Sequence, residues 1–227
     1  MIKVVLWDID GTLLDFLKAE HQAIKNCFAI FDLGICTDEM VSKYSLINKK
    51  YWEMFERGEI TKDQVLRGRF TEFFTSENIS TTVIDDFNKE YQLQLGECIF
   101  FNDDSFNIVR NLKGKVKQYA VTNGTKIAQE KKLYRSGFDK LFDGVFISEN
   151  VGAQKPSASF FDYVFSKIGK YEKDEVMIVG DSLTSDILGG NNAGIKCCWY
   201  NPEHKEKHIN VKIDVEIDDL NKILTII

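Results

Sequence analysis

The sequence predicts an α/β fold, a doubly wound parallel sheet that is interrupted after its first strand by an inserted, all-helical unit. Two observations predict it. Short apolar runs recur along the chain, and helix-like segments separate the later ones. Between residues 16 and about 100 no such run occurs, and amphipathic helix patterns follow one another instead. Because the apolar runs are continuous rather than alternating, we expect strands that are covered on both faces, as in a parallel sheet.

Five apolar runs that end in polar or glycine residues are the predicted strands. They are VVLWD (4–8), YAVTNG (119–124), GVFISE (144–149), VMIVGDS (176–182) and CCWYNP (197–202). Two segments between them predict helices with one apolar face. These are residues 105–112, followed by Gly114, and residues 157–168, followed by Gly169, where a glycine favours helix termination.

The insert predicts successive amphipathic helices. Their segments are 21–31, 38–58, one that opens at Thr61 with Gln64 in capping-box spacing, and 82–95. We therefore expect a discontinuous core of residues 1–15 and 100–227 and a helical domain of residues 16–99.

Composition narrows the class of protein. A chain of 227 residues is long enough for one domain with a smaller insert, and its five scattered cysteines indicate no disulfide framework. The chain shows neither an apolar leader nor a run of roughly 18 apolar residues, so we expect a cytoplasmic protein without a membrane segment. The formal charge of −6 argues against a nucleic-acid polymer as partner but permits a small anionic substrate.

Carboxylates gather at two predicted strand ends. Asp8 and Asp10 follow the first apolar run and, two residues apart, face the same side of an extended segment. Asp181 and Asp186 follow the run VMIV. Parallel strands end at one edge of a sheet, where open α/β sheets bind ligands, and a hard divalent cation relieves the repulsion between clustered carboxylates. The pattern predicts a Mg²⁺ site.

Two further strand ends or loops carry groups suited to an anion. Thr122 and Asn123 offer a hydroxyl and an amide to phosphate oxygens, and Gly124 lets the backbone approach closely. Lys155 brings a compact positive charge to neutralise a phosphate or a nucleophilic carboxylate. We therefore expect phosphate chemistry at this edge.

Four motifs in order carry a family resemblance. DIDGT (8–12), VTNG (121–124), QKP (154–156) and GDSLTSD (180–186) resemble the motifs of the haloacid dehalogenase-like (HAD) phosphohydrolase superfamily, and the resemblance covers the whole chain. It implies a Rossmann-like core with a small helical cap domain, which closes over the substrate about hinges near residues 16–19 and 95–102.

The resemblance also implies a mechanism. Asp8 attacks phosphorus to form an aspartyl-phosphate, and Asp10 protonates the leaving oxygen and then deprotonates the hydrolytic water. Mg²⁺ is held by Asp8, the backbone carbonyl of Asp10 and Asp181, while Asp186 binds it through water or supports the ligands. The phosphate cradle consists of Thr122, Asn123, Gly124 and Lys155. Dehalogenases usually lack the second aspartate, so Asp10 favours phosphate chemistry.

Two flanking segments indicate a branch. ISENVGAQKP (147–156) and NAGIKCCWYNP (192–202) resemble the YjjG-type 5'-nucleotidases, which implies a small phosphorylated metabolite as substrate, a nucleoside 5'-monophosphate with pyrimidine and deoxy forms favoured. A sugar-phosphate or phosphoglycolate phosphatase and a phosphosugar mutase are the alternatives within the superfamily. A non-catalytic phosphate-sensing α/β domain is the alternative of another class. We expect a monomer or homodimer.

Other metal or nucleotide motifs fit poorly. An EF-hand loop beginning at Asp8 would need Gly at the position of Leu13 and Glu at that of Ala19, and no GxxxxGK[ST] phosphate loop occurs. His204 and His208 have zinc-ligand spacing, but they lie in a lysine-rich polar segment that we interpret as a solvated turn.

Overall fold

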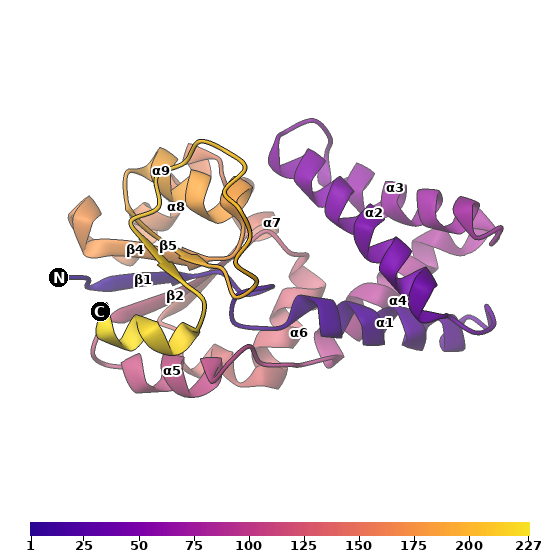
Figure 1. Ribbon diagram of the computed structural model, residues 1–227, viewed down its shortest axis with the longest axis horizontal. Coiled ribbons are helices and arrows are strands. Elements are labelled where there is room, and N and C mark those ends of the chain that lie inside the picture. The colour runs from indigo at the N-terminus through magenta and orange to yellow at the C-terminus, as the bar shows by residue number, and fades with distance from the viewer.

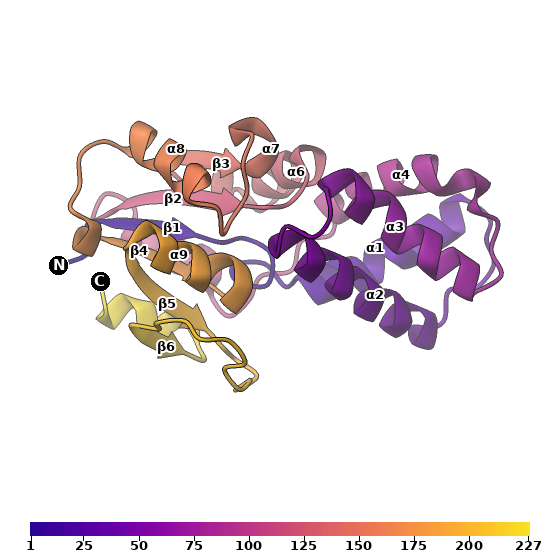
Figure 2. The same ribbon diagram turned by 90° about the horizontal axis from the view of Figure 1, so that it is seen from above.

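A six-stranded parallel sheet forms the centre of the core (Figure 1), in the order β3-β2-β1-β4-β5-β6 (Figure 2). The computed structural model describes residues 1–227. The strands are β1 Val4–Trp7, β2 Lys117–Thr122, β3 Gly144–Ile147, β4 Val176–Gly180, β5 Lys196–Tyr200 and β6 Val215–Ile217. The order reverses around β1, as in other doubly wound folds, and the predicted α/β, Rossmann-like fold class is confirmed.

Helices cover both faces of the sheet, and the pleat of β1 divides its fully buried side chains between them. Val5 and Trp7 pack in the cluster under α5 (Ser105–Leu112) and α6 (Lys126–Ser136). Val4 and Leu6 pack in the cluster under α8 (Ala158–Ile168) and α9 (Leu188–Ala193). This two-sided burial explains why β1 reads as a continuous apolar run.

The insert is a bundle of four helices around an aromatic core. They are α1 Phe16–Ile30, α2 Asp38–Glu56, α3 Lys62–Ser76 and α4 Ile84–Glu97. Tyr44, Phe70 and Phe87 pack edge-to-face or stacked with their neighbours at its centre. Both views place the bundle beyond the carboxyl edge of the sheet (Figures 1 and 2). The division into a core of 1–15 and 100–227 and a cap of 16–99 remains our proposal.

The remaining elements are short. They are α7 Ser148–Val151, the 3-10 helices η1 Thr81–Val83, η2 Phe138–Lys140, η3 Lys173–Glu175 and η5 Leu220–Thr225, and the π-helix η4 Leu183–Ile187. None of the helices has both the length and the apolar character that a bilayer crossing requires.

Element predictions agree with the structure where an apolar pattern exists. The five predicted strands are present, residues 105–112 form α5, and the Thr61–Gln64 capping box opens α3. The predicted start of the first helix at His21 is wrong: α1 begins at Phe16, because the Asp15 side chain accepts a hydrogen bond from Lys18 N and caps it.

Strand β6 and helix α6 are among the elements that had no prediction. Strand β6 is short and its sequence VEI is flanked by aspartates, and the buried face of α6 includes Gln129 and Lys132, so neither shows an apolar period. The predicted hinge residues 16–19 form the first turn of α1. Of the predicted hinge 95–102, residues 95–97 end α4 and residues 98–102 lie in the link to α5.

Candidate active site

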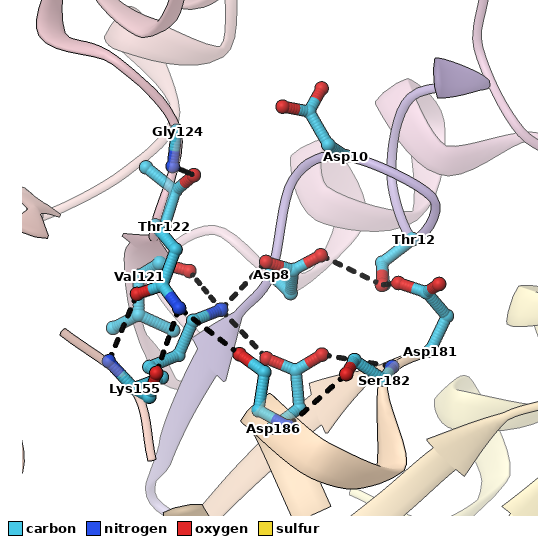
Figure 3. Close-up of polar contacts among 12 residues, drawn as sticks. Asp8, Asp10, Thr12, Val121, Thr122, Gly124, Lys155, Asp181, Ser182 and Asp186 are labelled. Carbon is cyan, nitrogen blue, oxygen red and sulfur yellow. Dashed lines mark hydrogen bonds and ion pairs between the residues drawn. The ribbon is translucent and has the colours of Figure 1, made fainter. Parts of the chain in front are cut away.

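Five of the predicted site residues meet at the carboxyl edge of the sheet, three of them at a strand end or directly after it (Figure 3). Asp8 follows β1, Thr122 ends β2, and Asp181 follows β4. Asp186 lies in η4, and Lys155 lies in the loop between α7 and α8. The parallel sheet therefore brings together residues that are far apart in the sequence.

Three carboxylates form a compact acidic cluster. Asp8, Asp181 and Asp186 each offer an oxygen within 4.8 Å of the others. Burial, followed by the negative charge of Asp186, raises the pKa of Asp8 well above its ordinary value. The same two causes, in the same order, raise the pKa of Asp181 to about 7. The cluster therefore has excess negative charge, which a cation would neutralise.

Lys155 is the cation that the chain itself supplies. Its Nζ donates to Asp8 Oδ1 at 2.7 Å, to Asp186 Oδ1 at 2.6 Å and to the carbonyl of Val121 at 2.9 Å. Burial alone would lower the pKa of Lys155, but attraction to Asp186 and Asp8 outweighs it and raises that pKa. The side chain is 1 % exposed, so this ion pair is not screened by water.

Thr12 shows that the carboxylates have too few donors. Its Oγ1 lies 3.2 Å from Asp8 Oδ2 and 3.1 Å from Asp181 Oδ1. A hydroxyl has one hydrogen, so it can donate to only one of these oxygens at a time. The unpaired oxygen and the hard oxygen donor set fit a divalent cation such as Mg²⁺. Sequence reasoning did not select Thr12, although it belongs to the DIDGT motif.

Asp186 supports the cluster with both of its oxygens. Oδ1 accepts from Lys155, and Oδ2 accepts from the backbone N–H of Ser182 at 3.1 Å. Since both oxygens have protein partners, the arrangement fits contact with a metal through water or through neighbouring ligands. Its role as a metal ligand remains a prediction.

Gly11 makes room for Asp181. A Cβ at this position would lie 2.6 Å from Asp181 Oδ2, and the backbone φ of +90° also favours glycine. The glycine of DIDGT therefore lets the first loop pass directly over a carboxylate of the fourth strand.

The phosphate loop is braced from within. The hydroxyl of Thr122 accepts from Gly124 N at 3.1 Å. The Asn123 amide donates to the carbonyl of Lys155 at 2.8 Å and accepts from Lys155 N at 2.9 Å. The Asn123 side chain therefore fixes the loop that carries Lys155, and the Thr122 hydroxyl keeps its proton to donate.

Asp10 stands apart from the acidic cluster. Its carboxylate points away from Asp8 in Figure 3. Gln129 Nε2 donates to Asp10 Oδ2 at 2.6 Å, and Lys132 forms an ion pair with Asp10 Oδ1. The structure thus separates the two aspartates of DIDGT: Asp8 faces the cluster and the Asp10 side chain faces α6.

Two insert residues reach the site from the facing ends of α2 and α3, on either side of the turn that joins these helices. Glu56 accepts from Ser182 Oγ at 3.4 Å and from Thr184 Oγ1, and burial raises the pKa of Glu56 to about 7. Lys62 Nζ donates at 3.1 Å to the carbonyl of Gly124 and to Ser148 Oγ. Glu and Lys beside a helix end are ordinary surface residues in sequence, so no pattern could have selected them.

A cavity of about 430 Å³ is lined in part by Lys62, the residue that donates to the Gly124 carbonyl of the phosphate loop. The insert contributes Phe55, Ile60 and Lys62, and the core contributes Glu149 and Gln154, which directly precedes Lys155. The cavity offers both apolar walls and polar groups to an organic ligand.

The region from residue 2 to residue 194 matches the family model of haloacid dehalogenase-like hydrolases. The chain belongs to this family. The HAD resemblance predicted from the four motifs is therefore confirmed, and the protein is a hydrolase.

One related hydrolase matches this chain over nearly the full length of both proteins. The chain is 34% identical over 227 residues to the HAD-hydrolase YfnB of Bacillus subtilis, covering 99% of this chain and 95% of the relative. The crystal structure of YfnB bound to magnesium superposes with a TM-score of 0.91 over 99% of this chain and 98% of that one, at 33% identity.

Two relatives are named as pyrimidine 5'-nucleotidases. PynA of Streptococcus pneumoniae is 32% identical over 225 residues, covering 98% of this HAD chain and 93% of PynA. YjjG of Escherichia coli is 30% identical over 203 residues, covering 89% and 88% respectively. The chain is therefore similar to the 5'-nucleotidase branch that its flanking segments resemble.

Proposed function

We propose that this HAD hydrolase is a Mg²⁺-dependent phosphatase that hydrolyses nucleoside 5'-monophosphates, with pyrimidine and deoxy forms favoured, through an aspartyl-phosphate. One observation carries the chemistry: the Asp8 carboxylate is buried, paired with Lys155 and placed beside Asp181 and Asp186, so that three carboxylates face a single lysine. The substrate class rests on the similarity to PynA and YjjG.

Asp8 is the nucleophile of the first step. Lys155 holds Asp8 Oδ1 at 2.7 Å, which leaves Oδ2 to attack phosphorus and displace the nucleoside oxygen. The cation would be held by Asp8, Asp181 and the Asp10 backbone carbonyl, with Asp186 in support, and it would neutralise charge between the carboxylate and the phosphate. The Thr122 hydroxyl and Lys155 stabilise the charge on the transferring phosphoryl oxygens.

Asp10 is the acid and then the base. It protonates the leaving nucleoside oxygen and afterwards removes a proton from the water that attacks the aspartyl-phosphate. The products are a nucleoside and inorganic phosphate, and Asp8 returns to its free carboxylate.

The cavity lined by Phe55, Lys62 and Gln154 is the proposed binding site of the nucleoside. Lys62 lines that cavity and donates to the carbonyl of Gly124, so this side chain connects the phosphate cradle to the proposed organic subsite. Its volume of about 430 Å³ accommodates a base and a sugar, and the surrounding amide and charged groups can pair with polar base edges.

The proposal also covers the cellular location, the oligomeric state and the partners of the protein. We place the protein in the cytoplasm as a monomer or homodimer that acts on small metabolites and not on nucleic-acid polymers. Five free thiols, of which four are buried, and a formal charge of −6 support this.

The test is phosphate release from a substrate panel with Mg²⁺, and with EDTA as control. The panel holds pyrimidine and purine 5'-monophosphates, 3'-monophosphates, sugar phosphates and phosphoglycolate. We expect metal-dependent release that is fastest with pyrimidine 5'-monophosphates. Preference for a sugar phosphate would retain the chemistry and overturn the substrate. Stoichiometric phosphorylation without turnover would favour a phosphate-sensing domain.

A further inference from the structure

We propose that Lys132, together with Gln129, is a positioning residue that holds the Asp10 carboxylate toward the leaving group. The inference rests on the proposed function, because it assigns a role through the acid/base Asp10. Neither residue belongs to a motif of the sequence, and both lie on α6.

The side chain of Lys132 is almost completely buried, which is unusual for a lysine. Its side chain is 1 % exposed, and Asp10 Oδ1 is its one hydrogen-bond and ion-pair partner. The ammonium also lies 5.2 Å from the centre of the Phe16 ring. Burying a lysine is unfavourable unless the charge is paired, and the other two lysines on this helix, Lys126 and Lys131, are exposed and half-buried, respectively. The positive charge of Lys132 is therefore paired with the Asp10 carboxylate.

Gln129 holds the second oxygen of the same carboxylate. Its Nε2 lies 2.6 Å from Asp10 Oδ2, and a Cβ at Gly124 would overlap its amide. Gln129 therefore fills the space between the phosphate loop and Asp10. Since each carboxylate oxygen has two lone pairs and uses one here, each keeps one for a proton in transfer.

The direction of the carboxylate suits an acid in an in-line displacement. The attacking oxygen of Asp8 and the leaving oxygen lie on opposite sides of phosphorus. A group that protonates the leaving oxygen must therefore stand away from Asp8, as the Asp10 side chain does in Figure 3. With a donor on each oxygen, the carboxylate is fixed in one rotamer, and an acid fixed in place loses no orientational entropy during the reaction.

Helix α6 is a firm support for these donors. Thr125 caps it directly after the phosphate loop and donates to Gln92 of α4 at 2.7 Å. Lys131 pairs with Glu97 of α4 at 2.6 Å, and Ala128 packs into the aromatic core of the insert. One rigid helix thus begins at the phosphate site and positions the acid.

The experiment compares two leaving groups. A nucleoside 5'-monophosphate needs its leaving oxygen protonated, whereas p-nitrophenyl phosphate releases a stable phenolate. For Lys132→Met we expect kcat with the nucleotide to fall about 10- to 100-fold and kcat with p-nitrophenyl phosphate to fall less than about threefold, with KM nearly unchanged. Lys132→Arg restores part of the nucleotide rate, and in an Asp10→Asn background Lys132→Met adds no further selective loss.

Lys126→Met is the matched control, since Lys126 lies on the same helix with an exposed side chain, and it should leave both rates unchanged. Equal losses of Lys132→Met on both substrates, or none, would overturn the positioning role. If Lys132→Met does not fold, Gln129→Met and Lys132→Arg decide by the same comparison of leaving groups. Failure of the proposed function is distinct: wild-type protein would then release no phosphate, or Asp8→Asn would remain active.

Discussion

Glu56 makes folding of the metal-free protein pH-dependent, and Glu56→Gln should remove that part of the dependence. The carboxylate belongs to the insert, but it accepts hydrogen bonds from Ser182 and Thr184 beside the acidic cluster. Glutamine keeps a carbonyl that accepts the same bonds and carries no charge. The substitution therefore removes the titration while keeping the contact.

The sign and size of the pH effect on stability follow from the raised pKa of Glu56. Burial raises the pKa of Glu56 from 4.5 to about 7, so the folded protein keeps this proton while the unfolded chain releases it. The free energy of unfolding therefore falls as pH rises between these two values and is constant above about 7. At about 1.4 kcal/mol per pH unit the full effect is about 3 kcal/mol. Because solvent still reaches part of the side chain, we expect about 1–2 kcal/mol.

Urea unfolding in EDTA at about pH 5 and about pH 8 measures this effect. Asp8 and Asp181 also have raised pKa values, but they are present in both proteins, so the difference between wild type and Glu56→Gln isolates Glu56. The variant should gain about 1–2 kcal/mol relative to wild type over this interval. Glu53→Gln, on the exposed side of the same helix, should gain nothing. Parallel pH profiles for wild type and Glu56→Gln would refute the reasoning.

Three further outcomes are expected at the acidic cluster. Asp8→Asn should lower phosphate release at least about 1,000-fold with an unchanged circular dichroism spectrum, and an active, folded variant would exclude Asp8 as nucleophile. Gly11→Ala places a methyl carbon 2.6 Å from Asp181 Oδ2 at a φ of +90°, so calorimetry should show weaker Mg²⁺ binding and a lower Tm. Since the pKa of Asp181 is raised to about 7, Mg²⁺ must displace a proton below that pH, and its affinity should fall up to about tenfold per unit as pH decreases. A pH-independent affinity would contradict this.

The cluster could be predicted from sequence because its members follow strands with continuous apolar runs. A run such as VVLW identifies a buried parallel strand, and the edge at which such strands end is common to all of them. Asp8, Asp181 and Thr122 were placed together by this rule alone, and the structure brings them to one edge. Lys155 was selected for its positive charge, and it lies in a loop between two helices, where the strand-end rule does not apply.

The strand-end rule did not select Gln129 and Lys132, because these residues lie on a helix. Helix α6 has no apolar period because its buried face includes Gln129 and Lys132, and both of those side chains contact Asp10. Such pairing joins residues more than a hundred positions apart, and no local pattern records it. Polar residues on the buried face of a helix, such as Gln129 and Lys132, are therefore the sequence feature that indicates such a site.

The insert is joined to the core by two unlike kinds of contact, which bears on how a cap could move. At α4 and α6 the joint is buried and includes Ala128 in the aromatic core, and separating apolar surfaces in water is costly. At the turn between α2 and α3 the joint consists of polar contacts of Glu56 and Lys62, which water can replace at small net cost. Opening at the turn, with α4 and α6 still packed, would uncover the cavity beside the phosphate loop while Lys132 and Asp10 stay in contact. The acid would then be in place before the substrate arrives.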